Sequence, residues 1–388
     1  MAKTYNRKYH NWLLALKQLV DGEYPDYPVA GGILARGTDF QPNTEIETSD
    51  WTGHTGGDSL VIESDRTSAT SAPQYSHKAL IGECLEEYFY MALASHDAPV
   101  AAETGATKAK KWKIYKDAST PKDLPKATLI NQYSATLKDA VIYDNAMMNE
   151  LQLEVNNDGW TVTPSFASDM EMMNQPNQPR TLSTSIYKLP KNNTKIYIAP
   201  VDVTLTDANK EEYAYDCLLS NSITIRNNLE ESECLNDIFG KNQQDKGDFE
   251  IEGEAEVKWN LLAAFLHDEW QTGDAHGVYV TENSLFKQVL LECEGSKIET
   301  VNGEDINAKM SIWLPYVEIT QVDPGDLSGD DNRTLTVSYN LRAGTTTTAN
   351  PVEVTIINEL TALHYGTELT IDTTSVGSTT VAGVDLPA

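Results

Sequence analysis

A row of carboxylates is the feature of this sequence whose residue types and spacing have the clearest chemical consequence. Between Gly247 and Trp259, small or apolar residues alternate with four acidic ones: Glu250, Glu252, Glu254 and Glu256. A period of two is the period of a β-strand, so the pattern predicts a strand over residues 248–258 with all four carboxylates on one face. Neighbouring carboxylates would lie about 6.6 Å apart and repel by about 0.6 kcal/mol per pair in water. We therefore expect a hydrated acidic face and a buried apolar face.

Motifs for catalysis or for cofactor binding are missing from the sequence. There is no phosphate-binding loop, no GxSxG nucleophile turn and no HExxH metal pair. Four cysteines, Cys84, Cys217, Cys234 and Cys293, lack CxxC spacing, which favours reduced thiols over zinc or disulfides. We therefore predict no catalytic, cofactor-binding or metal-binding residues and no enzyme activity.

An oxygen-rich segment between Asp323 and Asp331 leaves two interpretations open. Its carboxylates are the ligands that calcium prefers, although the spacing does not match a calcium-binding helix–loop–helix. Its Asp, Pro, Gly and Ser residues also suit a turn between two strands without any metal, which is the interpretation we favour.

The charge balance excludes tight binding to nucleic acid. The 388 residues include 58 Asp and Glu against 29 Lys and Arg, a net charge of −29, and such a surface repels phosphates. An apolar fraction of 40% argues against disorder. No stretch resembles a signal peptide or a membrane helix, so we expect a soluble protein that folds in a cytoplasm and has no membrane partner.

The elements that must position the acidic row follow from the periodicity. The first half predicts a helix at residues 11–22 and strands within 29–75. A second predicted helix is capped by Ser76 and carries Ile81, Cys84, Leu85, Tyr88 and Ala92 on one face. A lysine-bearing loop at 95–125, strands at 127–137 and 150–163, and a linker at 168–186 complete this half.

The second half repeats the order of strands, helix and strands. Strands are predicted at 195–205, 218–226 and 248–258, then a helix with Trp259, Leu262, Ala263, Leu266 and Trp270 on one face. Further strands are predicted at 286–294, 309–321, 333–342 and 351–357. Either an ancient duplication or the general similarity of mixed β proteins explains this order. Unpaired strand edges invite association, and an oligomer that closes the sheets into a barrel removes them. The acidic row would then line the wet channel of that barrel.

Three pieces of the chain carry a resemblance to a known family. They are Gly31-Gly-Ile-Leu-Ala-Arg-Gly-Thr-Asp-Phe40 with Ala72-Pro-Gln-Tyr-Ser76, Ser220-Asn-Ser-Ile-Thr-Ile-Arg-Asn-Asn-Leu229, and Pro351-Val-Glu-Val-Thr-Ile-Ile-Asn358. In this order, over about residues 25–360, the chain resembles the tail tube proteins of long-tailed bacterial viruses. The resemblance implies a mainly β fold with a few helices, built of two tandem tail-tube-type β-sandwich or barrel domains, each flanked by one α-helix.

The same resemblance implies a domain order. An N-terminal arm with a short helix would occupy residues 1–24, the two tube-type domains residues 25–185 and 186–344, and a C-terminal extension residues 345–388. A chain with two such domains would form trimeric rings that mimic hexamers, with true hexamers as the alternative.

The function implied is that of a structural virion protein. Rings would stack into a tail tube through which DNA passes without tight binding, and Glu250, Glu252, Glu254 and Glu256 would line its lumen. Lys108, Lys110, Lys111 and Lys113 would form a contact loop between rings, and tape-measure and terminator proteins would be further partners. The alternatives are an acidic carbohydrate-binding or carbohydrate-active β-sandwich protein and a surface adhesin.

Overall fold

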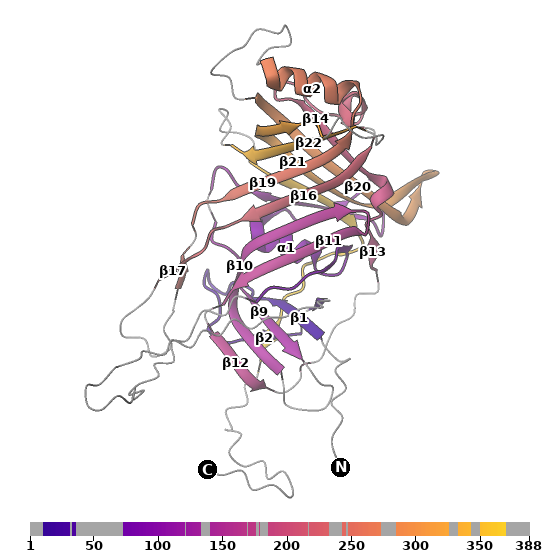
Figure 1. Ribbon diagram of the computed structural model, residues 1–388. Helices are drawn as coiled ribbons and strands as arrows, with labels where there is room; N and C mark the ends of the chain where they lie inside the picture. Colours follow the sequence, from indigo (N-terminus) through magenta and orange to yellow (C-terminus); the bar gives the residue numbers. More distant parts are fainter. Residues whose placement is uncertain are drawn as a thin grey trace, which may run out of the picture.

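The computed structural model describes residues 11–31, 33–35, 73–120, 122–132, 140–168, 170–175, 178, 185–215, 217–232, 243–245, 247–272, 285–325, 333–342 and 350–369. Within them the protein is mainly β, with two α-helices (Figure 1). Most strands pair into one closed barrel, whose parts we describe as three sheets that share long strands. The mainly β composition agrees with the predicted fold class at that level.

Six antiparallel strands form what we call the acidic sheet. In spatial order they are β11 (Gly159–Ala167), β10 (Ala140–Asn156), β16 (Leu218–Arg226), β19 (Glu250–Lys258), β22 (Thr334–Leu341) and β21 (Glu304–Asp323). The strands predicted at 218–226, 248–258 and 333–342 are confirmed. The single strand predicted at 150–163 is instead a hairpin of β10 and β11, because a turn with Gly159 at φ 95° reverses the chain.

A second layer, the outer sheet, shares β21 with the acidic sheet. Its strands are β8 (Lys110–Lys116), β23 (Glu353–Asn358), β21, β20 (Leu285–Val301) and β14 (Thr194–Pro200). Short strands border it, namely β6 (Ala94–His96) and β7 (Val100–Ala101) beside β8, and β15 (Ala214–Tyr215) beside β14. The strand predicted at 351–357 is confirmed and is an inner strand, between β8 and β21.

A third group, the lower sheet, shares β10 with the acidic sheet. Its strands are β3 (Ile33–Ala35), β1 (Asn11–Leu16), β9 (Ala127–Gln132), β10 and β12 (Met170–Gln175). The helix predicted at 11–22 is therefore wrong: residues 12–17 are all buried, and β1 is paired on both edges. The linker predicted at 168–186 likewise contains a strand, β12.

Short elements complete the described chain. The paired strands are β4 (His77–Lys78) with β11, β5 (Leu80–Ile81) with β13 (Tyr187–Lys188), β2 (Val29–Ala30) with β24 (Thr367–Glu368), and β17 (Glu230–Ser232) with β18 (Gln243–Asp245). The single-turn 3₁₀ helices are η1 (Lys191–Asn193) and η2 (Lys210–Tyr213).

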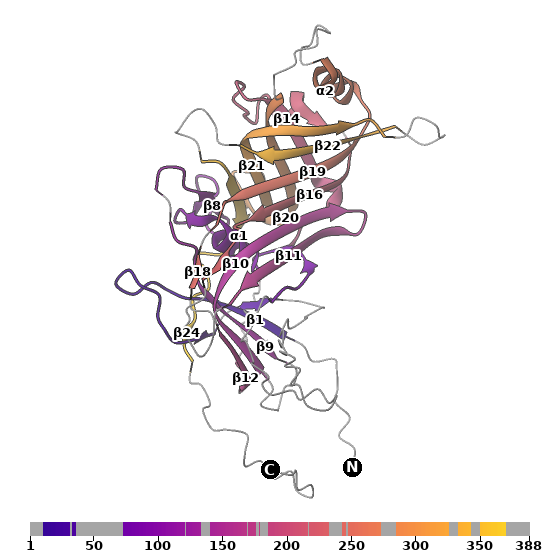
Figure 2. The ribbon, with the colours of Figure 1, turned by 60° about the vertical axis from the view of Figure 1, so that its left-hand side comes forward.

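The two helices occupy different environments. Helix α1 (Leu85–Leu93) begins after Cys84 rather than after Ser76, because residues 77–81 form β4 and β5 and Gly82 adopts a φ of 79°. It lies behind β10 and β11 and is buried at every position except Tyr90 (Figures 1 and 2). Helix α2 (Leu261–Thr272) lies at the far end of the molecule and is capped by Asn260, whose Oδ1 accepts a hydrogen bond of 2.9 Å from the Ala263 amide.

One continuous apolar core joins the two halves of the sequence. It contains residues of both helices, of the acidic sheet and of the outer sheet. Strands from the two predicted domains also pair directly, β10 with β16 and β8 with β23. The predicted boundaries at 24/25, 185/186 and 344/345 stay predictions.

Candidate functional site

The predicted acidic row lies in the middle of the acidic sheet. Strand β19 is paired with β16 on one edge and with β22 on the other. Glu250, Glu252 and Glu254 are exposed and Glu256 is half-buried, whereas Ile251, Gly253, Ala255 and Val257 are buried. The expected wet face and apolar face are both present.

The strands beside β19 present hydroxyl and amide groups to the same face. Across one edge, Glu256, Glu254 and Glu252 lie opposite Ser220, Ser222 and Thr224. Across the other edge, the same three glutamates lie opposite Thr336, Ser338 and Asn340. These neutral neighbours hydrate well and do not cancel the charge of the glutamates.

More distant strands extend the acidic character of this face. By strand register, the face carries Glu150, Glu154, Glu250, Glu252, Glu254, Glu256, Glu318 and Asp323. The cations of the same rows are Lys78, on β4 beside β11, and Arg226, Lys258 and Arg342. Eight carboxylates against four cations leave an excess of four negative charges on this face, within the described residues.

Arg226 ties three strands of the face together. Its Nε donates to Glu150 Oε2 at 2.9 Å on β10, and its Nη1 donates to Glu252 Oε2 on β19. These two hydrogen bonds raise the pKa of the guanidinium above its usual value. Arg226 was not predicted as a functional residue, although its place at the end of the alternating stretch 218–226 was a usable signal.

The buried side of β19 depends on a close contact at one glycine. A Cβ added to Gly253 would lie 2.2 Å from ring atoms of Tyr339 on β22. The missing side chain therefore lets the Tyr339 ring lie flat on β19, where its hydroxyl is 3.4 Å from Asn221 Nδ2. This packing fixes β19 and β22 next to each other behind the charged row.

Part of the lysine-bearing loop predicted at 95–125 is a strand, which corrects the sequence interpretation at three of its four lysines. Lys110, Lys111 and Lys113 belong to β8, where Trp112, Ile114 and Lys116 alternate inward. Lys113 Nζ lies 2.9 Å from Glu353 on β23. Lys108 lies in the turn before β8, and its amide donates to Glu299 Oε1 at 2.9 Å. These lysines lie on the outer sheet rather than on the acidic face.

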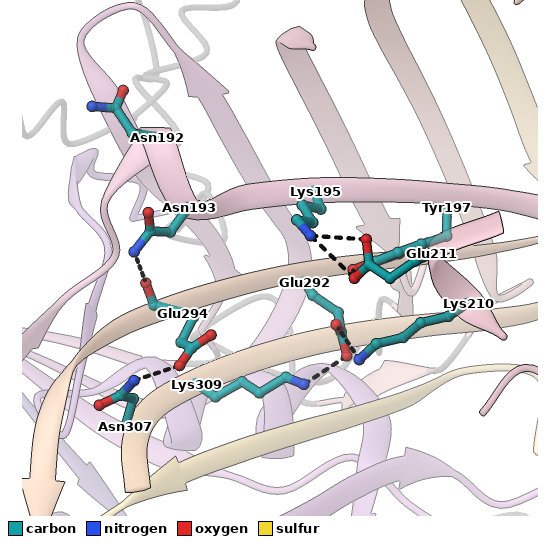
Figure 3. A pocket seen from close by; sticks show the side chains of 10 residues that line it. All are labelled: Asn192, Asn193, Lys195, Tyr197, Lys210, Glu211, Glu292, Glu294, Asn307 and Lys309. Atoms are coloured by element: carbon teal, nitrogen blue, oxygen red, sulfur yellow. Dashed lines mark hydrogen bonds and ion pairs between the residues drawn. The ribbon is translucent and has the colours of Figure 1, made fainter. Parts of the chain in front are cut away.

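The outer sheet carries a polar hollow of about 390 Å³ (Figure 3). Lysines and glutamates alternate across it: Lys195 contacts Glu211 at 2.9 Å, and Lys210 and Lys309 reach the two oxygens of Glu292 at 2.8 and 2.7 Å. Asn193 donates to the Glu294 carbonyl at 3.2 Å. Because these charges neutralise one another, the hollow is a mixed ionic surface and not an anion or cation site.

Two carboxylates that the sequence reasoning missed are buried on α1. Glu86 Oε1 accepts hydrogen bonds from the Gly82 amide and from Asn358 Nδ2, at 2.9 and 2.6 Å. Glu87 Oε1 lies 2.7 Å from His364 Nδ1. Burial and the neighbouring charge of Glu87 raise the pKa of Glu86 to about 7. The hydrogen bond to Glu87 raises the pKa of His364. These contacts attach the C-terminal segment 358–366 to the core.

Neither a cluster of metal-ligand side chains nor a membrane-spanning helix occurs among the described residues. No three His, Cys, Asp or Glu side chains among them converge as a metal site would require. Most of the proposed calcium segment, residues 326–331, lies outside the described residues. None of the described helices combines the length and the apolar character needed to cross a bilayer.

No protein-family model matches the chain, and no curated protein matches it significantly. The residues and the geometry of the acidic face are therefore the basis on which a function can be proposed.

Proposed function

We propose that this protein is a structural component of a viral tail tube, in which copies of the chain form stacked rings around a channel for DNA. The acidic face lines the channel. The observation that carries the proposal is the broad hydrated surface of the acidic sheet, on which eight carboxylates outnumber four cations.

Electrostatics supports this use of the face. A duplex carries one negative charge per about 1.7 Å of its axis, and proteins that hold it do so by neutralising phosphates with lysine and arginine. A wall of carboxylates interspersed with hydroxyl groups repels phosphates along its whole length, so DNA meets no strong binding minimum as it slides. Arg226 does not disturb this, since its charge is matched by Glu150 and Glu252.

The geometry of the sheet supports a role in a barrel. The strands of one chain already pair into a closed barrel, and in the proposed ring the acidic faces of neighbouring copies lie side by side around the channel. Here α1 and the outer sheet cover the apolar face of the acidic sheet, so only the polar face is available to a lumen. In this proposal the halves 25–185 and 186–344 are two tube-type domains that share one core, and three chains make a ring of six units.

Electron microscopy of the purified full-length protein tests the proposal. Rings or hollow tubes with a central channel, alone or after concentration, are the expected result. A chain that stays monomeric at high concentration, and that binds an oligosaccharide in a glycan array, would replace the proposal with the carbohydrate-binding alternative.

A further inference from the structure

Exposed large apolar side chains form two patches at opposite ends of the described molecule. On α2, Leu261 is 70% exposed and Phe265 is 61% exposed, and one helical turn separates them. In the segment after β1, Leu19 is 50% exposed and Val20 is 59% exposed. We name these the helix patch and the turn patch. Apolar groups clustered on a surface mark sites of association more often than scattered ones do.

The helix patch has a positively charged border on one side. Lys258, at the end of β19, is exposed two residues before the N-cap Asn260. The guanidinium of Arg333 lies 3.3 Å from the ring centre of Trp259, beside the same helix end. The N-terminus of α2 adds the positive end of the helix dipole.

The turn patch is rigid and has an acidic border. Val20 and Glu23 exchange two backbone hydrogen bonds, of 2.8 and 3.1 Å, around Asp21 and Gly22. Both central residues have positive φ, 53° and 90°, as a tight two-residue hairpin turn requires. Asp21, Glu23 and Asp26 are exposed, and residues 18–28 contain no lysine or arginine.

We infer that the helix patch of one copy docks on the turn patch of the next copy, with Lys258 and Arg333 facing Asp21 and Glu23. The two patches match in apolar character, and the cations at the N-terminal border of the helix patch are opposite in charge to the turn patch. The next turn of α2 carries the exposed Asp268, so the docked turn must lie toward the N-terminal end of the helix. Helix α2 lies at one end of the molecule, whereas β1 and β2, which flank the turn, lie toward the other, so one chain cannot join its own patches (Figures 1 and 2). Such a contact is heterologous, and a heterologous contact generates rings when its rotation closes.

This inference rests on the proposed function and names the surfaces through which copies meet within a ring. Leu261 and Phe265 would lose their exposure at a contact centre, where a few apolar side chains dominate affinity. Replacing both by Asp should raise the concentration for half-assembly about tenfold or more. Val100→Asp is the matched control, because Val100 is 59% exposed and belongs to neither patch.

A mixing experiment with full-length chains decides between this contact and others. Leu261→Asp/Phe265→Asp chains keep the turn patch, and Leu19→Asp/Val20→Asp chains keep the helix patch. Each variant alone should stay monomeric in sedimentation velocity, and an equal mixture should form dimers but no rings, since one intact contact is left per pair. A mixture that stays monomeric, or a turn-patch variant that assembles like the wild type, would overturn the inference.

Charge exchange gives a second test that leaves the apolar side chains in place. Lys258→Glu should weaken assembly, and so should Asp21→Lys/Glu23→Lys, while mixing the two variants should restore the contact between them. If the wild-type protein forms rings and all of these variants form them equally well, this inference is wrong and the proposed function is not affected. A wild-type chain that never assembles would remove the proposed function and the inference with it.

Discussion

The acidic face and the outer face of the molecule use charge in different ways. On the outer sheet, lysines and glutamates are interleaved, with Lys113 on Glu353, Lys195 on Glu211, and both Lys210 and Lys309 on Glu292. On the acidic sheet, the residues opposite Glu254 and Glu256 are serines and threonines. Both sheets are antiparallel, share β21 and cover the same core.

The two faces differ in how much of their charge is required for folding. A balanced surface like the outer face is sufficient to keep a sheet hydrated and paired. The excess of carboxylates on the acidic face costs a few tenths of a kcal/mol per neighbouring pair and contributes nothing to pairing. Because this cost has no structural return, we propose that the surface is kept acidic for what passes along it.

Reversing the charge of the acidic row should have the largest effect. With Glu250, Glu252, Glu254 and Glu256 all changed to Lys, we expect a folded protein whose assemblies retain DNA, because each lysine can neutralise a phosphate and release counterions. DNA affinity at about 50 mM salt should rise more than 100-fold and should fall steeply as salt is added. Filter binding across a salt series measures both quantities.

The outer face supplies the control for that experiment. Changing Glu211, Glu292, Glu294 and Glu353 to Lys adds the same positive charge on the other sheet and should leave DNA passage unchanged. If the two quadruple variants behave alike, net charge matters and the sidedness of the molecule does not.

The buried carboxylate Glu86 sharpens the comparison, because burial raises its pKa. With the pKa of Glu86 raised to about 7 from 4.5, the native state holds a proton that the unfolded chain has released. The free energy of unfolding should therefore fall by about 3 kcal/mol as pH rises from 4.5 through 7. The raised pKa of His364 acts in the same direction, because its pairing with Glu87 is fully present below pH 6.5 and is lost as pH rises through its folded pKa.

Denaturant titrations at pH 5 and pH 8 measure this slope. Glu86→Gln should flatten it, since the amide keeps one acceptor and cannot titrate. Glu254→Gln on the acidic face should leave it unchanged. A slope that vanishes with Glu254→Gln instead would mean that the surface row governs stability.

The sequence predicted the acidic sheet better than it predicted the rest of the fold. Strands β16, β19 and β22 alternate with period two because one of their faces meets water, so their pattern is visible without the structure. Strand β1 was taken for a helix because a short run such as Trp12 to Leu16, buried on both sides, has no periodicity that distinguishes helix from strand. Strand β8 did show alternation, with Trp112 and Ile114 between lysines, but its charge suggested a loop.

The candidate site likewise has features that the local sequence pattern predicts and features that it does not. The face of β19 and its exposure follow from local alternation. Arg226 and its pairing with Glu150 and Glu252 do not, because strand register brings together residues 76 and 26 positions apart. Nor does local pattern explain why Gly253 is needed, since the cause lies in Tyr339 on another strand.

Gly253 tests whether the two sides of β19 are independent. Gly253→Val should lower the free energy of unfolding by about 2–3 kcal/mol, because the new side chain and the Tyr339 ring cannot occupy the same space. Glu254→Val, the next residue on the exposed side, should change it by less than about 0.5 kcal/mol. Urea denaturation of both variants makes the comparison, and equal destabilisation would contradict the assignment of buried and wet sides.

The smallest expected effect comes from comparing Arg226, a cation on the acidic face, with Lys195, a cation on the outer face where charges are balanced. Arg226→Met removes two contacts at once and leaves Glu150 and Glu252 facing each other's charge, so we expect a loss of about 1 kcal/mol. Lys195→Met on the outer face breaks one exposed pair and should cost at most about 0.5 kcal/mol.

Salt distinguishes the two variants further. About 0.5 M NaCl shortens the screening length to a few ångströms and should recover much of the stability lost in Arg226→Met. It should hardly affect Lys195→Met, because no excess of like charge remains around Glu211. Equal salt dependence in the two variants would mean that the acidic face carries no more net repulsion than the outer face.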